Sequence, residues 1–275
     1  FCSPPSPTPT ATATGTPSPT PTATVASPTP TLSTAQALNI STRLRVDTGD
    51  NVGIGGFIIG GAGDLRVVIR GLGPSLGQLG VPDFLVDPVL EGLNDNWQDD
   101  PSQAAQLTKL GLAPTNPLES AIVETLLPGA HTAILSGKDG GTGVGLVEVY
   151  NIDSSVPVAN IELANISTRG LVQTGNNVMI GGFILGSGNN SGIIVRGIGP
   201  SLSEFGVPNA LADPTLELRD NNGALLVGND NWQDDPAMAA QLSVHGLAPS
   251  NPNESGIFLE LQSGLYTAIL AGKNG

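Results

Sequence analysis

The nine-residue stretch Val52–Gly60, "VGIGGFIIG", is short, apolar and interrupted by glycine. Val, Ile and Phe are enriched in β-strands, and a run this short favours a strand over a helix. Similar runs follow, separated by segments rich in Gly, Pro and Asn: Leu65–Gly71, Ala121–Leu126, Ala130–Leu135 and Gly145–Tyr150. Short strands with frequent turns predict an antiparallel β-sandwich.

The second half of the chain repeats the first. Ile54–Ile58, "IGGFI", returns 126 positions later as Ile180–Ile184, and later motifs return 135 positions later. The extra residues of the second copy fall around Leu216–Gly228, "LELRDNNGALLVG", where alternating apolar residues flank Asn221-Asn-Gly223. An Asn-Gly pair favours a type I′ turn, so we expect a β-hairpin there.

One short helix is predicted in each copy. In the first copy, Asp100 precedes Pro101 and Gly111 closes the segment, which is the order of an N-cap, a first helical residue and a C-terminal glycine. The counterpart in the second copy is Asp235–Gly246. The predicted fold is therefore mainly β: two tandem antiparallel β-sandwich-like domains, each with one short helix.

Residues 1–36 differ in composition from the rest, being almost entirely Pro, Thr, Ser and Ala. Such a segment cannot bury enough apolar surface to fold, and its prolines favour extended polyproline II conformations. We predict a disordered Pro/Thr-rich stalk at 1–36, of the kind that separates extracellular modules. We assign repeat 1 to residues 37–153, a linker to 154–162 and repeat 2 to 163–275.

The two copies end differently. Repeat 1 continues into Gly145–Tyr150, "GLVEVY", a strong strand pattern, whereas repeat 2 stops at Gly272-Lys-Asn-Gly275, before the equivalent strand. A domain that lacks its final strand exposes a sheet edge. The simplest expectation is that the sequence in hand stops short of that strand. The alternative is that a neighbouring subunit donates a strand to the sheet edge of repeat 2, as in donor-strand assemblies.

The composition narrows the class of protein. Asp and Glu outnumber Lys and Arg by 24 to 10, which disfavours nucleic-acid binding because that needs clustered positive charge. No run of about 18 apolar residues is present, so no membrane span is expected. Low charge content and abundant glycine suit a secreted or cell-surface β-rich protein. Cys2 is the only cysteine and is either an incidental thiol or a lipidated residue.

The segment Gly73-Pro-Ser-Leu-Gly77 matches G-x-S-x-G, the nucleophile elbow of serine hydrolases. A hydrolase also needs a helix after the serine, a general base and an orienting acid. The proline and glycines around Ser75 argue against that helix, and the second copy reads Gly199-Pro-Ser-Leu-Ser203. The two histidines, His131 and His245, do not occupy equivalent positions. We therefore predict no catalytic residues and no enzyme activity.

The best candidate site is "NDNWQDD", which occurs in both repeats. Its oxygen-bearing side chains suit Ca²⁺, the one candidate cofactor, although no EF-hand spacing is present; the alternative is that they cap helices and form turns. Asp87 and Asp213, each before a proline, fit either role. The candidate metal ligands are Asn94, Asp95, Asn96 and Asp99 in repeat 1, and Asn229, Asp230, Asn231 and Asp234 in repeat 2.

Trp97 and Trp232 lie inside this motif. One interpretation is a platform on which a sugar ring stacks. The interpretation that we favour is a large core anchor beneath the loop, because carbohydrate-binding modules usually display several aromatic side chains and this chain has ten in all, mostly Phe within strand patterns.

Arginine and glutamate also recur in matching places, as Arg70 with Arg196 and Glu119 with Glu254. The arginines, together with Arg43 and its counterpart, stand at strand ends. We expect partly buried ion pairs between these arginines and either the glutamates or the aspartates.

The combination "ANISTRG", "TGNNVMIGGFILG", "VRGIGPSL", "GVPNALADPTLELRDNNG" and "NDNW" resembles repeat modules of large secreted proteins of environmental bacteria, and the resemblance covers about residues 37–275. The function of that family is uncharacterised. "DNNGALLVGNDN" and "SGLYTAIL" are also similar to bacterial pre-peptidase C-terminal-type β-sandwiches, which are non-catalytic and in some cases calcium-associated. Neither resemblance supplies catalytic residues.

The function predicted from the sequence is a non-catalytic, secreted or cell-surface structural or adhesive repeat module, an accessory part of a longer protein. Its expected partners are other extracellular domains or surface polymers. Two alternatives stay open: a carbohydrate-binding module, and an extracellular filament subunit assembled by strand donation.

Overall fold

The computed structural model describes residues 35–153 and 162–274. The predicted stalk, except for its last two residues, and the linker at 154–162, except for Glu162, lie outside the described residues. The described part of repeat 1 contains the strands β1 (Ala37–Val46), β2 (Gly53–Gly60), β3 (Leu65–Leu72), β4 (Pro88–Leu90), β5 (Ser120–Leu126), β6 (Gly129–Gly137) and β7 (Gly143–Asn151). The predicted mainly β, antiparallel fold is confirmed.

Repeat 2 follows a similar order of elements, with one additional strand and no equivalent of β7 among the described residues. Its strands are β8 (Glu162–Arg169), β9 (Met179–Leu185), β10 (Ser191–Gly197), β11 (Pro214–Asp220), β12 (Leu225–Asn229), β13 (Ser255–Leu261) and β14 (Gly264–Gly272). The helices are α1 (Pro74–Gln78), α2 (Pro101–Leu110) and α3 (Pro236–Val244), with 3-10 turns at η1 (Gly49–Asn51), η2 (Lys138–Gly140), η3 (Gly175–Asn177) and η4 (Pro200–Phe205). None of the helices in the described ranges has the length and apolar character that a membrane span requires.

The predicted helices are confirmed as α2 and α3. The carboxylate of Asp100 accepts hydrogen bonds from the backbone N–H groups of Ser102 (2.7 Å) and Gln103 (3.2 Å), so it caps α2. Gly111 ends the helix in the left-handed conformation, with φ of 70°. Local signals therefore placed both ends of this helix correctly.

Helix α1 corrects an expectation. The glycine-broken sequence after Ser75 argued against a helix, yet a five-residue helix begins at Pro74. Pro74 supplies the pre-set φ that suits a first helical residue. The chain can turn sharply before it because a Cβ on Gly73 would lie 1.9 Å from the carbonyl oxygen of Leu85, so only glycine fits there.

The hairpin that is specific to repeat 2 is confirmed as β11 and β12, but its turn is not type I′. A type I′ turn needs positive φ at two central residues, and only Gly223 has it, at 79°. The Asp220 carboxylate instead accepts hydrogen bonds from the N–H groups of Asn222 and Ala224, both at 2.9 Å. An aspartate-centred turn of this kind competes with the Asn-Gly preference.

The two repeats exchange their first strands. β1 of repeat 1 pairs with β9 of repeat 2, and β8 of repeat 2 pairs with β2 of repeat 1, both antiparallel. The two pairings have the same register: Arg43 lies opposite Ile180, and Arg169 lies opposite Ile54. The exchange is therefore reciprocal and obeys a local pseudo-twofold symmetry.

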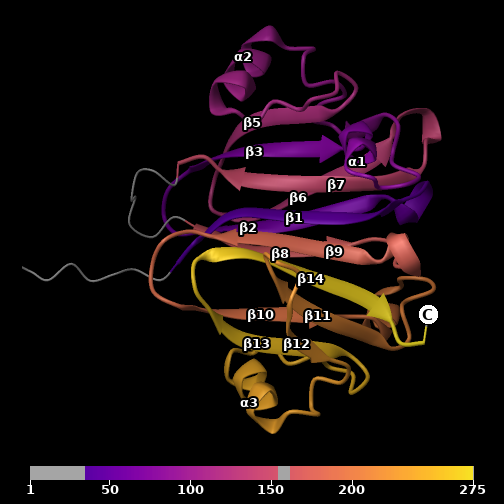
Figure 1. Ribbon diagram of the computed structural model, residues 1–275, viewed down its shortest axis with the longest axis vertical. Helices are drawn as coiled ribbons and strands as arrows, with labels where there is room; N and C mark the ends of the chain where they lie inside the picture. Colours follow the sequence, from indigo (N-terminus) through magenta and orange to yellow (C-terminus); the bar gives the residue numbers. More distant parts are fainter. Residues whose placement is uncertain (1–34, 154–161, 275) are drawn as a thin grey trace, which may run out of the picture. The chain divides into compact units, whose positions relative to one another are not determined.

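Strand exchange builds sheets that run through both repeats. β1 lies between β7 and β9, so it joins one continuous sheet in the order β5-β3-β7-β1-β9-β14-β11-β12. The strands β4-β6-β2-β8 form a second series, which is linked to the first by one bridge between Ala37 and Leu163. Among the strands of the described residues, β10 and β13 pair only with each other (Figure 1).

Contacts at the exchange join equivalent residues of the two repeats. The hydroxyl groups of Thr42 and Thr168, which are 126 positions apart in the chain, lie 2.6 Å from each other. A residue that meets its own counterpart marks the axis of a twofold arrangement. The main hydrophobic core likewise combines Leu44 and Val147 with Leu163 and Met179. The described residues 35–153 and 162–274 therefore belong to one compact unit, and the division into two domains stays a prediction.

Candidate functional site

The "NDNWQDD" motif forms the loop between β4 and α2 in repeat 1, and its counterpart lies between β12 and α3. The Asn94 side chain spans the loop: its oxygen accepts the Ala121 N–H (3.0 Å) and its amide donates to the Asn96 carbonyl (3.2 Å). Asn229 makes the same two bonds, to Gly256 (2.7 Å) and Asn231 (3.0 Å). Both asparagines therefore tie the loop to a neighbouring strand.

The second half of the motif is a local turn. The Asp99 carboxylate lies 3.4 Å from the Asn96 backbone nitrogen and 3.5 Å from its side-chain nitrogen. In repeat 2, the Asn231 amide donates to Asp234 at 3.1 Å. Asn and Asp form such turns in many loops, so these contacts support a role in turn formation.

Asp95 and Asp230 face a lysine in each repeat. The Lys138 ammonium lies 2.8 Å from the Asp95 carboxylate and 4.0 Å from that of Asp87. In repeat 2, Lys273 lies 2.5 Å from Asp230 and 3.7 Å from Asp213. The hydrogen bond to Asp95 raises the pKa of Lys138, and the bond to Asp230 raises that of Lys273. Each lysine thus supplies positive charge beside its carboxylate pair.

One ammonium does not satisfy both carboxylates. The Oδ1 atoms of Asp87 and Asp95 are buried and have no hydrogen-bond partner among the described residues. Burial raises the pKa of Asp87, Lys138 lowers it, and Asp95 raises it further. Within the described residues, no group of three or more His, Cys, Asp or Glu side chains is arranged to hold a metal ion. The calcium site therefore stays a prediction.

Trp97 packs beneath its loop. Its indole N–H donates to the Asn116 carbonyl at 3.1 Å, and its ring contacts a small core cluster that contains Val68 and Leu107. An indole held by both its polar and its apolar atoms behaves as an anchor. The anchor interpretation is supported for Trp97, whereas the Trp232 indole N–H is buried without a partner among the described residues. The sugar platform stays an untested alternative.

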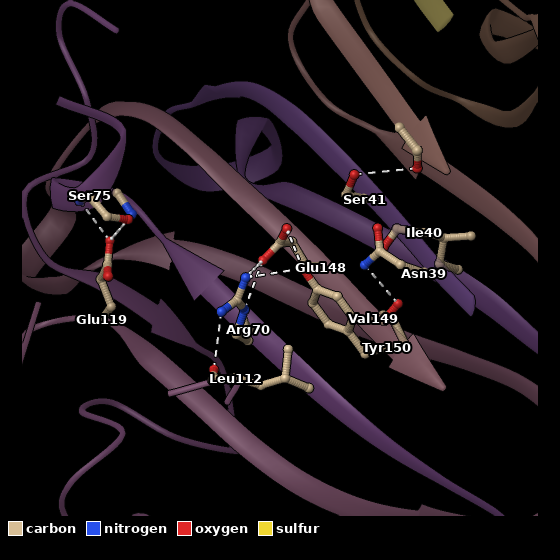
Figure 2. A network of polar contacts seen from close by, with 12 residues as sticks. Asn39, Ile40, Ser41, Arg70, Ser75, Leu112, Glu119, Glu148, Val149 and Tyr150 are labelled. Carbon is tan, nitrogen blue, oxygen red and sulfur yellow. Dashed lines mark hydrogen bonds and ion pairs between the residues drawn. The ribbon is translucent and has the colours of Figure 1, made fainter. Parts of the chain in front are cut away.

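Ser75 is bound to a buried glutamate (Figure 2). Glu119, which is 0% exposed, accepts hydrogen bonds through one oxygen from the Gly73 N–H (3.0 Å), the Ser75 N–H (2.8 Å) and the Ser75 hydroxyl (2.6 Å). Glu254, equally buried, makes the same contacts in repeat 2 at 3.0, 3.0 and 2.5 Å. The expectation that these glutamates pair with arginine is wrong, because backbone N–H groups at a tight turn take that place.

The contacts of Ser75 fit a structural role better than a nucleophilic one. Its hydroxyl proton points at a carboxylate that already accepts two backbone donors, so that carboxylate serves as an anchor for the turn. Neither histidine contacts Ser75: His131 stacks on Phe57 with 5.5 Å between ring centroids, and His245 stacks on Phe258 at 5.8 Å. A serine–histidine pair of the hydrolase type is therefore not formed by these residues.

A polar network around Arg70 occurs in repeat 1 and has no equivalent among the described residues of repeat 2. Arg70 on β3 lies opposite Glu148 on β7; its Nε donates to the Glu148 carboxylate at 2.8 Å, and a second guanidinium nitrogen makes a shorter contact. The guanidinium also donates to the Tyr150 hydroxyl (3.1 Å) and the Leu112 carbonyl (3.1 Å) (Figure 2). Burial, followed by the charge of Glu148, raises the pKa of Tyr150 to about 12.

Sequence reasoning identified Arg70 but missed its partner. Glu148 stands inside an apolar strand pattern, where a single carboxylate is itself a signal for a buried ion pair. The lysines were also missed, although Gly137-Lys138 and Gly272-Lys273 occupy the same place in the two repeats. Their recurrence at the same position in both copies was therefore a signal that could have identified Lys138 and Lys273.

Comparisons of the chain with protein-family models, with curated proteins and with solved structures find no match. The resemblance to repeat modules of secreted bacterial proteins therefore stays a prediction that rests on the quoted motifs.

Proposed function

We propose that this chain is a non-catalytic structural or adhesive repeat module, exposed outside the cell as an accessory part of a longer protein. The observation that carries the proposal is the reciprocal strand exchange, in which β1 pairs with β9 and β8 pairs with β2. Two repeats joined in this way cannot separate until both pairings break. Such a junction suits a module whose task is to transmit tension or to hold other domains at a distance.

The polar residues that occur in both repeats support the same role. Glu119 holds a turn, Asn94 ties a loop to a strand, and Asp95 pairs with a lysine. Their counterparts in repeat 2 make equivalent contacts. Side chains retained in duplicate therefore serve the fold, which agrees with a non-catalytic module.

The junction can be tested by cutting the chain after it has folded. A protease site placed within residues 154–161 allows the connection between repeats to be cleaved in the native protein. We expect the two fragments to elute together in size-exclusion chromatography and to separate only in denaturant. Fragments that part under native conditions would contradict the proposed mechanical role. The uncut protein carrying the same insertion is the control.

The non-catalytic part of the proposal has its own test. A fluorophosphonate probe reacts with activated serines, so it should not label the native chain, and Ser75→Ala should behave as wild type towards the probe. Labelling of Ser75 or Ser201 would overturn this part. The adhesive part is tested by retention of the chain on immobilised cell-surface polymers, with Trp97→Ala distinguishing sugar stacking from general adhesion.

A further inference from the structure

A small cavity, which we call the Arg43 pocket, lies beside β1 where the two repeats meet. Its volume is about 150 Å³, and it is lined by Arg43 of β1, by the loop at residues 79–82 that follows α1, and by Asn176 of η3. The strand exchange brings these elements together, because η3 comes just before β9 and β9 pairs with β1. The cavity opens to solvent, since Leu79 and Asn176 are exposed.

The Arg43 side chain is partly withdrawn from water without a charged partner. Thr42 and Leu44 on either side of it are buried in the core, so Arg43 points to the outer face of the sheet. Its Nε is buried and has no hydrogen-bond partner among the described residues, and none of the ion pairs found there includes Arg43. Burial lowers the pKa of Arg43, because a guanidinium that loses water is less stable as a cation. An acceptor in the pocket would therefore stabilise this side chain.

The strands beside β1 do not supply the missing negative charge. β7 carries one carboxylate, that of Glu148, and Arg70 already binds it. β9 carries no acidic residue. Residues 1–34 and 154–161 also contain no Asp or Glu. Neither of the two neighbouring strands, and neither of these two segments, therefore has a free side-chain carboxylate to offer to Arg43.

The walls of the pocket indicate which kind of anion fits. The backbone N–H groups of residues 79–81 all donate to carbonyl groups of α1, at 3.0 or 3.1 Å, and Pro82 has no N–H. The loop therefore offers apolar side chains and no backbone donor, so the donors are the Arg43 guanidinium and the Asn176 amide. Phosphate and sulfate have oxygens on every side, and those that face the loop would stay unpaired. A carboxylate has its oxygens at one end and carbon at the other, which matches these walls.

The equivalent residues elsewhere in the chain differ at one decisive position. Arg169 is the counterpart of Arg43, and residues 205–208 are the counterpart of the loop. Asn176, however, corresponds to Asp50, so the equivalent place carries a carboxylate in the position of the amide. A carboxylate at that position repels a bound anion. Anion binding is therefore expected at Arg43 and not at its counterpart.

We propose that the Arg43 pocket binds a small carboxylate that has a short apolar stem. The guanidinium of Arg43 donates to the carboxylate oxygens, the Asn176 amide donates to one of them, and the stem lies against the side chains of residues 79–82. Hydrogen bonds between a guanidinium and a carboxylate are charge-assisted and stronger than neutral ones. A single negative charge also suits a chain with a formal charge of −14, which repels anions of higher charge.

An occupant of the pocket contacts both repeats at once. Arg43 belongs to repeat 1 and Asn176 to repeat 2, and the pairing of β1 with β9 holds them together. A ligand that binds only the folded protein raises its stability. Because the pocket forms only when these two strands are paired, the carboxylate should raise the unfolding temperature. The inference is independent of the proposed structural or adhesive role.

Side-chain ¹H–¹⁵N spectra of the 275-residue chain test the proposal, because they report on the Nε–H groups of the arginines. The Arg43 signal is identified by its loss in Arg43→Lys. We expect sodium propionate to shift this signal saturably and to raise the unfolding temperature of wild type more than that of Arg43→Lys. Asn176→Asp should weaken propionate binding by about tenfold or more, because it places a second carboxylate beside the ligand. Asn176 is exposed, so this substitution should leave the fold intact.

Two controls test whether propionate binds at the pocket. Arg169→Gln removes the charge of the equivalent arginine and should leave binding unchanged. Sodium chloride at the same ionic strength should not give a saturable shift. A shift that grows linearly with every salt, or binding that is unaffected by Asn176→Asp, overturns the proposal and shows a hydrated arginine only. Phosphate or sulfate that binds as tightly as propionate also overturns it, because the pocket would then not select a carboxylate.

Discussion

The first strands of the two repeats have nearly the same sequence and different surroundings. β1 lies between two full-length neighbours, β7 and β9, whereas β8 has one among the described residues, β2. Asn39, Ile40 and Thr42 are buried in β1, and none of their counterparts is buried in β8. The difference teaches that burial here depends on the number of strands alongside and not on the residues of the strand itself.

The buried glutamates, in contrast, make equivalent contacts in the two repeats. Glu119 and Glu254 are both fully buried and hold the same turn through the same three donors. The comparison therefore separates sites that are complete within each repeat from sites that need β7. Substitutions at matched positions can test this division.

The largest loss of stability is expected when the buried glutamates are substituted. Glu119→Ala leaves three donors without an acceptor and opens a cavity, so it should lower the free energy of unfolding by about 3–5 kcal/mol. Glu254→Ala should do the same, because its contacts are equivalent. Urea denaturation of both variants measures the two losses. A difference above about 2 kcal/mol would show that the repeats are not equivalent even at this site.

Substitution of the two equivalent arginines should lower the free energy of unfolding by different amounts. Arg70→Ala leaves the largely buried Glu148 carboxylate without its partner, which should cost about 2–4 kcal/mol. Arg196→Ala removes one long hydrogen bond at an exposed position and should cost less than about 0.5 kcal/mol. The same denaturation experiment applies. Arg70→Lys should fall between wild type and Arg70→Ala, since it keeps the charge and loses the two-pronged contact.

Alanine substitutions at two equivalent glycines test how much space lies beneath β7. Gly55→Ala forces a methyl group against Val147 and should destabilise the protein by about 1–3 kcal/mol. Gly181→Ala meets open space at a backbone conformation that is ordinary for alanine, and should be neutral or stabilising by about 0.5 kcal/mol. Thermal unfolding of the two variants measures the two changes in stability. Equal losses would mean that the space at Gly181 is already filled.

A further effect is a dependence of the protein's stability on alkaline pH. The pKa of Tyr150 is raised to about 12 from the usual value near 10, so the unfolded chain releases this proton first as the pH rises. The stability that Tyr150 contributes is complete below about pH 10 and is lost between pH 10 and 12. Absorbance at 295 nm should show a tyrosine that titrates near pH 12 and disappears in Tyr150→Phe. A Tyr150 that titrates near pH 10 would contradict the buried network.

Features that depend on neighbours in the chain were predictable. The caps of α2 follow from Asp100 and Gly111, and most strands follow from short apolar runs. The turn at Gly223 and the helix at Pro74 were missed because side-chain contacts and a close approach to Leu85 decide them. These deciding contacts were not visible in local residue preferences.

The candidate site was predictable in position and not in chemistry. "NDNWQDD" was recognised as a retained loop, yet its Asp95 pairs with Lys138, which is 43 residues away. Arg70 was recognised, while its partner Glu148 is 78 residues away. Long-range partners of this kind are set by which strands lie side by side. The oxygen-rich composition of the loop suits both a cation and a lysine.

By itself, the sequence determined the duplication, the strand and helix segments and the residues that recur in both repeats. Only the tertiary structure decided which repeat each first strand joins. Ile54–Ile58 and Ile180–Ile184 have the same sequence, so β1 and β8 can pair with either in the same register. The residues of these strands therefore fit the exchanged and the unexchanged pairings equally well. The packing of whole sheets, with β7 beside β1 and β3, distinguishes them.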